Sequence, residues 1–161
     1  MATMNVREDI TTITPQDVED IEKVSMRWLL QAFIDFGWET ATIFLDSPDD
    51  VKDVAEDVTR EVLDRLPGYN VTQRILGTVD YKKGRYIILP SQTVRQALFV
   101  DSKAEKSDSS ATIQMSQTSM HVKQVRAGQS VDVPGTLDCI HIVSGMQYLV
   151  TTLFVHYYYE E

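Results

Sequence analysis

The sequence contains only one cysteine, Cys139, so no disulfide can form within the chain. This excludes a secreted scaffold held together by disulfides, and it fits a reducing compartment such as the cytoplasm. No plausible base stands beside Cys139, and we expect it to be a small core residue.

Long apolar segments are also missing. The longest, Tyr148–Tyr159, is interrupted by Thr151, Thr152 and His156, and it is too short and too rich in β-branched residues for a membrane span. Residues 1–20 carry acidic side chains and no apolar core, so they do not resemble a secretory signal. We therefore expect a cytoplasmic protein with no membrane segment.

Glycine is scarce, and the seven glycines form none of the motifs GxGxxG, GxxxxGK or GxSxG. Dinucleotide-binding, P-loop and nucleophile-elbow enzymes are therefore not supported. His121, His141 and His156 show no ligand spacing with one another or with Cys139, which argues against a zinc site.

The composition that is present fits one globular domain. Of the 161 residues, 43% are hydrophobic and 24% are charged, and neither a repeat nor a linker divides the chain. We expect a single domain over residues 1–161, in which residues 1–13 form a ragged lead-in.

Two amphipathic helices are predicted to open this domain. Thr14 and Pro15 are an N-cap and a first helical residue, apolar residues recur at helical spacing over 18–36, and Gly37 is expected to end the helix. A second helix is predicted over 47–66, because a Ser-Pro-Asp-Asp start precedes a single apolar stripe.

After residue 68 the pattern changes to short β-branched or aromatic segments separated by turn signals, which is typical of strands. The fold class is therefore α/β (α+β), with helices packed on a mixed β-sheet. Residues 107–120 are compatible with either a polar helix or a loop. The predicted strands cover residues 74–81, 85–89, 97–103, 122–125, 130–133, 137–143 and 147–159.

The net charge of −9 is unevenly distributed. Residues 1–66 hold 16 acidic and 6 basic residues, residues 71–126 hold 4 acidic and 9 basic residues, and residues 127–161 hold 4 acidic residues and no basic one. An acidic protein is a poor candidate for phosphate binding in general. The central segment nevertheless allows a local basic face, although these charges are equally compatible with an ordinary solvated surface.

Two acids and a lysine are predicted to meet at one edge of the sheet. Leu98–Val100 is a continuous apolar run, typical of a central strand, and Asp101 and Lys103 follow it two residues apart, so both project to the same side. Asp80 ends an earlier strand of similar character. If the strands are neighbours, this set suits metal-assisted phosphodiester hydrolysis: Asp80 and Asp101 would hold Mg²⁺, and Lys103 would orient a water and stabilise charge on the phosphate.

Plainer interpretations of these residues remain open. Asp101 and Lys103 could form an ordinary salt bridge at a strand end. A further acid from the second helix would suit the site, but Glu56 and Asp57 flank the apolar stripe on opposite sides, so only one of them can readily face the sheet edge. For each of these two acids a solvated helix face is the simpler interpretation.

Asp80, with Val79 where the pattern prefers proline, and Asp101-Ser102-Lys103 resemble the PD-(D/E)XK nuclease signature. That core alone is weakly specific. A series of blocks in the same order and at near-equal spacing also resembles the SfiI-like type II restriction endonucleases, from about residue 18 to the C-terminus, and this series is highly specific. The blocks are Leu29–Phe33, Ala55–Thr59, Thr78–Lys82, Phe99–Ala104, Ile113–Gln117 and Val150–Tyr159.

The resemblance implies a restriction-endonuclease-like core and a Mg²⁺-dependent endonuclease that cuts double-stranded DNA at a specific, interrupted palindromic site. It implies a homodimer or homotetramer and a cognate DNA methyltransferase in the same system. Asp80, Asp101 and Lys103 match the family's catalytic positions, and Glu56 matches the helix acid that related nucleases often add. Family members continue beyond Tyr159, so we expect this chain to lack their C-terminal part.

Basic and polar residues near the expected catalytic strands are candidate DNA contacts. Basic residues near Asp80 would meet phosphates, and polar residues after the second strand would contact base edges. A charged turn and a polar surface are the alternatives. The phosphate candidates are Lys82, Lys83 and Arg85, and the base candidates are Gln114, Ser116 and Gln117.

Two other functions fit the same residues. One is a structure-specific repair nuclease built on the same core, and the other is a non-catalytic or truncated DNA-binding or assembly protein.

Overall fold

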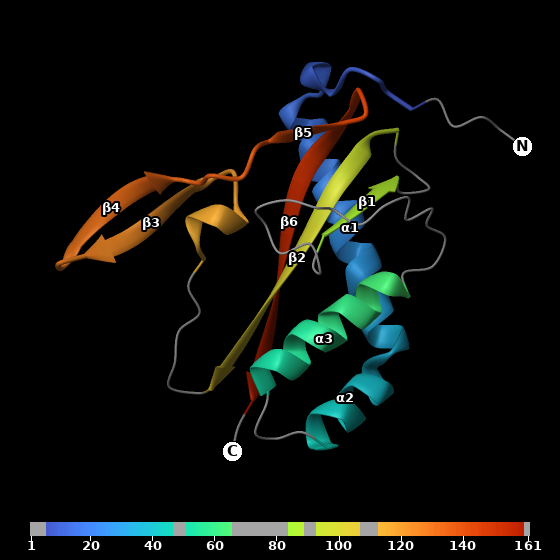
Figure 1. The fold of residues 1–161 in the computed structure, drawn as a ribbon, viewed down its shortest axis with the longest axis vertical. Helices are drawn as coiled ribbons and strands as arrows, with labels where there is room; N and C mark the ends of the chain where they lie inside the picture. The colour runs from blue at the N-terminus through green and yellow to red at the C-terminus, as the bar shows by residue number, and fades with distance from the viewer. Residues whose placement is uncertain (1–5, 47–50, 66–83, 89–92, 107–112, 160–161) are drawn as a thin grey trace, which may run out of the picture.

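A computed structural model of the chain describes residues 6–46, 51–65, 84–88, 93–106 and 113–159. The strand predicted over 74–81 lies outside these residues. In the described part, three α-helices accompany a four-stranded mixed sheet, and a two-stranded hairpin stands to one side of it (Figure 1). The predicted fold class, helices packed on a mixed sheet, is confirmed.

The first helix, α1 (Pro15–Asp35), begins where the sequence predicts. The Thr14 hydroxyl accepts a hydrogen bond from the backbone N–H of Asp17 at 3.2 Å, and the Asp17 carboxylate accepts one from the backbone N–H of Thr14 at 2.8 Å. This reciprocal capping box satisfies two of the donors that a helix start leaves unpaired.

The lead-in is more ordered than expected. It contains a short 3-10 turn, η1 (Ile10–Thr12), and Ile10 is only 1% exposed because it packs in a small cluster with Ile21 of α1 and Leu149. Burial of that one side chain ties the start of the described chain to the sheet.

A second helix that the sequence analysis did not predict follows α1 directly. Gly37 does not end helical structure; it begins α2 (Gly37–Asp46), because its backbone does not take the left-handed conformation that ends helices. The backbone N–H of Thr40 bonds to the carbonyl of Phe36 at 3.0 Å, so helical bonding resumes at once. No residue of α2 is buried.

The second predicted helix is confirmed as α3 (Val51–Asp64). Its apolar stripe is buried, including Val58 and Val62 at 3% and 2% exposure. Thr59 also lies 2.9 Å from the Tyr157 hydroxyl, and burial raises the pKa of Tyr157 to about 12, so its phenol stays protonated and bonds α3 to the sheet.

The sheet has the order β1-β2-β6-β5. Its two central strands, β2 (Arg95–Lys106) and β6 (Met146–Tyr159), run parallel over eleven register pairs from Gln96–Leu149 to Lys106–Tyr159. The edge strands, β1 (Gly84–Ile88) and β5 (Ile140–Val143), are each antiparallel to their neighbours. Asp101 and Lys103, which the sequence places at the end of a strand, therefore lie within a central strand of twelve residues.

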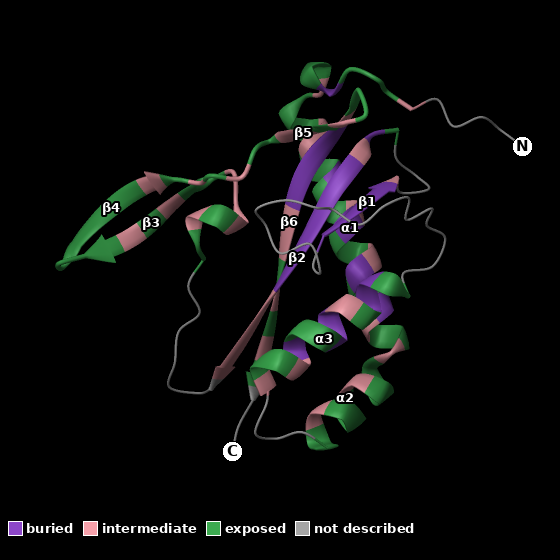
Figure 2. Cartoon of the chain, viewed as in Figure 1, coloured by how far each residue is buried: buried purple, intermediate pink, exposed green. Residues whose placement is uncertain are grey.

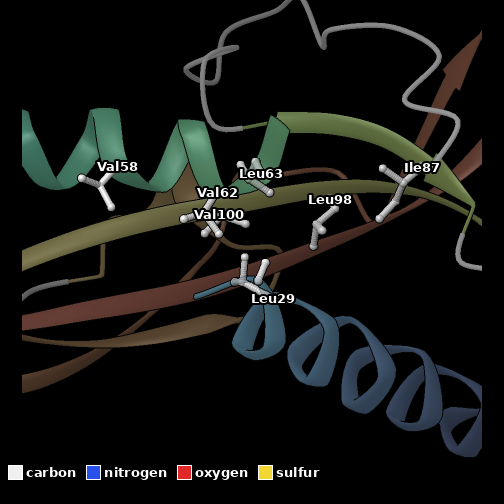
Figure 3. Packing of buried hydrophobic residues seen from close by; sticks show 8 residues of the cluster. Leu29, Val58, Val62, Leu63, Ile87, Leu98 and Val100 are labelled. Atoms are coloured by element: carbon white, nitrogen blue, oxygen red, sulfur yellow. The ribbon is translucent and has the colours of Figure 1, made fainter. Parts of the chain in front are cut away.

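Buried residues of the sheet lie in β1 and in the upper parts of β2 and β6 in Figure 2, and they form a different cluster on each face. On one face, Leu98 and Val100 of β2 pack against Leu29 of α1 and against Val62 and Leu63 of α3, with Val58 and Ile87 nearby (Figure 3). On the other face a second cluster forms from Tyr86, Ala97, Phe99, Tyr148 and Val150. Because strand side chains alternate, Asp101 and Lys103 share the face of Phe99, opposite to the helices.

The remaining strands form a hairpin of β3 (His121–Arg126) and β4 (Gln129–Pro134). Its two-residue turn is Ala127-Gly128, with φ of 50° and 78°, the left-handed pair that a tight hairpin requires. None of the described helices is both long and apolar enough to cross a membrane. Cys139 is exposed, so the expectation of a core cysteine is wrong.

Candidate active site

Asp101 and Lys103 form an ion pair on the face of the sheet that the helices do not cover. The Lys103 ammonium lies 2.8 Å from Asp101 Oδ2, and the two side chains are 20% and 11% exposed. The strand alternation predicted from sequence thus brings both groups to one side. The low exposure strengthens their mutual attraction relative to water, because screening by solvent is reduced.

Gln117 completes a closed set of contacts with this pair. Its amide nitrogen donates to Asp101 Oδ1 at 3.0 Å, and its amide oxygen accepts from the Lys103 ammonium at 3.2 Å. Each of the three side chains therefore contacts the other two. From the sequence Gln117 is only a candidate base contact, since a separation of 14 residues from Lys103 does not indicate that it reaches back to β2.

The segment that carries Gln117 is held by backbone hydrogen bonds. Gln117 ends the 3-10 turn η4 (Met115–Gln117), and its side-chain oxygen also accepts the backbone N–H of Gln114 at 2.8 Å. The chain after β4 returns to the same segment: the N–H of Thr136 bonds to the Met115 carbonyl at 2.8 Å. The sequence left both a helix and a loop possible for residues 107–120. Their described part contains a 3-10 turn that hydrogen bonds hold to the chain after β4.

Gly135 is the position where this tether allows no side chain. A Cβ there would collide with the Thr118 carbonyl oxygen and lie 2.6 Å from the Met120 carbonyl oxygen. Backbone atoms cannot swing away as a flexible side chain can, so one of the two segments must move.

We expect Gly135→Ala to lower the free energy of unfolding by about 1–3 kcal/mol, the usual cost of overpacking. Chemical denaturation measures the change. Gly37→Ala is the matched control, because no atom lies within 4 Å of the added Cβ and the backbone there is helical, so it should be neutral or slightly stabilising. Equal stabilities of the two variants would contradict the close contact at Gly135.

The same face continues beyond Lys103 to a pair that the sequence analysis did not assign to the site. Glu105, two residues on, pairs through Oε2 with His156 Nε2 at 2.8 Å, and the Glu105 side chain is 13% exposed. His156 is the register partner of Lys103 on β6. The spacing of two residues from Lys103 is the sequence signal that places Glu105 on the same face of the strand. Its partner on β6, His156, cannot be identified from the sequence.

Glu56 is exposed on α3, the helix that covers the opposite face of the sheet. Its assignment as the helix acid of the site stays a prediction. Asp80, Lys82 and Lys83 lie outside the described residues, so their convergence with Asp101 also stays a prediction.

Arg85 does not occupy a surface that DNA could contact. Its side chain is 1% exposed, and its guanidinium donates to Asp64 Oδ1 at 3.0 and 2.7 Å and to the Gly84 carbonyl at 2.8 Å. The predicted phosphate contact is therefore wrong for this position. A buried guanidinium needs a carboxylate partner, and it here links β1 to the end of α3.

Gln114 and Ser116 are exposed on and beside η4. Gln114 lines an open groove of about 1050 Å³ whose wall also includes Lys123 of β3 and Phe154 of β6. Phe154 is the register partner of Asp101, so this groove borders β2 near the Asp101–Lys103 pair. None of the described residues that line it is acidic.

The donor set at Asp101 fits a hard divalent cation. Mg²⁺ prefers oxygen ligands, keeps several waters and needs only one or two carboxylates from the protein. Among the described residues no three His, Cys, Asp or Glu side chains cluster as a metal site. On this face of β2, Asp101 pairs with Lys103 and Glu105 pairs with His156, so Asp101 is the carboxylate next to the lysine that a cation could share. The second predicted ligand, Asp80, is not among the described residues.

Comparison with known proteins connects this arrangement to one family. Residues 34–161 match the family described as type II restriction enzyme SfiI. The type II restriction enzyme SfiI of Streptomyces fimbriatus is 29% identical over 167 residues, covering 97% of this chain and 62% of that protein.

A solved structure agrees with the sequence match. The crystal structure of tetrameric restriction endonuclease SfiI bound to cognate DNA superposes with a TM-score of 0.77 at 25% identity, covering 97% of this chain and 62% of that one. The chain thus spans about three-fifths of the length of these relatives. Because the family match covers most of the chain, the protein belongs to the SfiI family of type II restriction enzymes.

Proposed function

We propose that this protein is a Mg²⁺-dependent type II restriction endonuclease that hydrolyses double-stranded DNA at a specific, interrupted palindromic site. The observation that carries the proposal is the Asp101–Lys103 pair at 2.8 Å on the uncovered face of a central strand, in a chain of the SfiI family. We take residues 1–161 as one nuclease domain located in the cytoplasm, where the DNA to be cut is found.

Asp101 and Asp80 would hold Mg²⁺. Glu56, exposed on α3 across the sheet, stays the predicted helix acid and is not needed as a ligand of this ion. Bound by the two aspartates, the ion supplies Lewis acidity at the scissile phosphate. Lys103 would orient the attacking water and stabilise the charge that develops on the phosphate oxygens. An ammonium has three N–H donors; among the described residues the Gln117 amide oxygen accepts one of them and Asp101 Oδ2 lies at ion-pair distance, so at least one donor remains for substrate.

DNA would lie along the groove between η4, β3 and Phe154. Gln114 would face base edges in the groove, Ser116 would contact DNA from the same turn beside it, and Lys82 and Lys83 would meet phosphates near Asp80. The absence of acidic side chains among the described residues of the groove wall supports this path, because phosphates repel carboxylates.

A palindromic site has two-fold symmetry, and each active site cuts one strand. We therefore propose at least a homodimer, and a homotetramer by analogy with the tetrameric relative bound to its cognate DNA. A nuclease of this kind would also destroy the DNA of its own cell, so a cognate methyltransferase that protects the site is expected with it.

The test is digestion of a long, sequence-diverse DNA by the purified chain with Mg²⁺, with EDTA in a parallel reaction. We expect discrete fragments that require Mg²⁺, and mapping of their ends gives the recognition site and overhang. Preferential cutting of forks or mismatches would favour the repair nuclease. DNA binding without cleavage in either Mg²⁺ or Mn²⁺ would favour the non-catalytic binding protein.

A further inference from the structure

The contacts of Gln117 give this residue a different role from a base contact. A side-chain amide that binds a DNA base must present its nitrogen and oxygen to the groove. Here both atoms are engaged inside the site, the nitrogen with Asp101 at 3.0 Å and the oxygen with Lys103 at 3.2 Å. Gln117 is also less exposed than Gln114 and Ser116 on the same segment.

We propose that Gln117 is a positioning residue: its amide sets the orientation of the Asp101 carboxylate and the Lys103 ammonium, and it couples both groups to the turn that carries the candidate DNA contacts. This inference rests on the proposed nuclease function. The amide donor occupies Oδ1 of Asp101 while Lys103 approaches Oδ2, so rotation of the carboxylate is restrained from both sides.

The coupling follows from the same atoms. The Gln117 side-chain oxygen accepts from the backbone N–H of Gln114 at 2.8 Å as well as from Lys103, so a shift of the turn moves the acceptor of the ammonium. Gln114 and Ser116 flank Met115 in this turn. Binding of DNA at these residues would therefore change the position of the groups that cut it.

The first test separates a positioning role from a DNA contact. Gln117→Met keeps the length of the side chain and removes its three hydrogen bonds, to Asp101, to Lys103 and to the Gln114 backbone. We expect kcat to fall by about 10- to 100-fold, the usual effect of losing a hydrogen bond to a charged group, while the Kd for a duplex with the mapped site, measured in Ca²⁺, changes less than twofold. Gln117→Asn keeps the amide on a shorter stem and should recover part of the rate.

Gln16→Met is the matched control. The Gln16 amide also donates to a carboxylate, that of Asp20 at 3.1 Å, but on the exposed first turns of α1, so neither kcat nor Kd should change. A weakened Kd with unchanged kcat in Gln117→Met would overturn the proposal in favour of a base contact. An unchanged kcat and Kd would overturn it as well.

A second readout needs no cleavage. Gln117→Glu places another carboxylate beside Asp101, so Mn²⁺ should bind the DNA-free chain about 10-fold more tightly, as measured by calorimetry, whereas Gln16→Glu should leave the affinity unchanged. If the wild-type chain cuts no DNA, the proposed function fails, yet this measurement still decides the position of Gln117. Unchanged Mn²⁺ affinity in Gln117→Glu would overturn the inference.

Discussion

Asp101→Asn and Lys103→Met are each expected to reduce DNA cleavage by about 10³-fold or more while the chain stays folded. A carboxylate that holds the metal and an ammonium that stabilises phosphate charge each contribute several kcal/mol to the transition state, and every 1.4 kcal/mol is a factor of ten in rate. Both substitutions preserve approximate side-chain shape. The measurement is single-turnover cleavage of a duplex that contains the mapped site.

Stability separates loss of chemistry from loss of fold in these variants. Because Asn can still accept the hydrogen bond from Gln117, we expect Asp101→Asn to change the free energy of unfolding by about 1–2 kcal/mol at most. Glu61→Gln and Lys23→Met are matched controls, since each removes a charge from an exposed ion pair within a helix and should leave cleavage unchanged. Full cleavage by either active-site variant would refute the assignment of that residue.

Leu98→Ala is expected to lower the free energy of unfolding by about 2–5 kcal/mol. Leu98 is 1% exposed on the central strand β2, where it packs between the sheet and the residues of α1 and α3 (Figure 3). Truncation leaves a cavity that neither helix can fill without losing its other contacts. Urea denaturation followed by circular dichroism gives the change.

Leu30→Ala provides the comparison for Leu98→Ala. Leu30 is 59% exposed on α1, so the same loss of three side-chain carbons should cost about 0.5 kcal/mol or less. A loss below about 1 kcal/mol for Leu98→Ala would show that the sheet and helices do not enclose this side chain as described.

Local sequence patterns were enough to predict those helices and strands whose apolar periodicity and end signals agree. Thr14, Pro15 and Asp17 specify the start of α1 through contacts within one turn, and the alternation of β2 places Asp101 and Lys103 together because strand side chains repeat every two residues. These features depend on residues at most a few positions apart. The same locality explains the error at Gly37: glycine ends a helix only in a left-handed conformation, and there it is helical.

Contacts between distant segments decided the rest. Arginine is a residue type that often binds phosphates, but Arg85 is buried and pairs with Asp64, 21 residues earlier in the chain. Glutamine is a residue type that often contacts DNA bases. In the fold, however, the return of the chain after β4 places the Gln117 amide between Asp101 and Lys103. The residue types and the strand that carries Asp101 and Lys103 could be predicted from the chain alone, because periodicity is a property of neighbouring residues. Which polar side chains meet was decided by the tertiary structure, because partners far apart in sequence leave no periodic pattern.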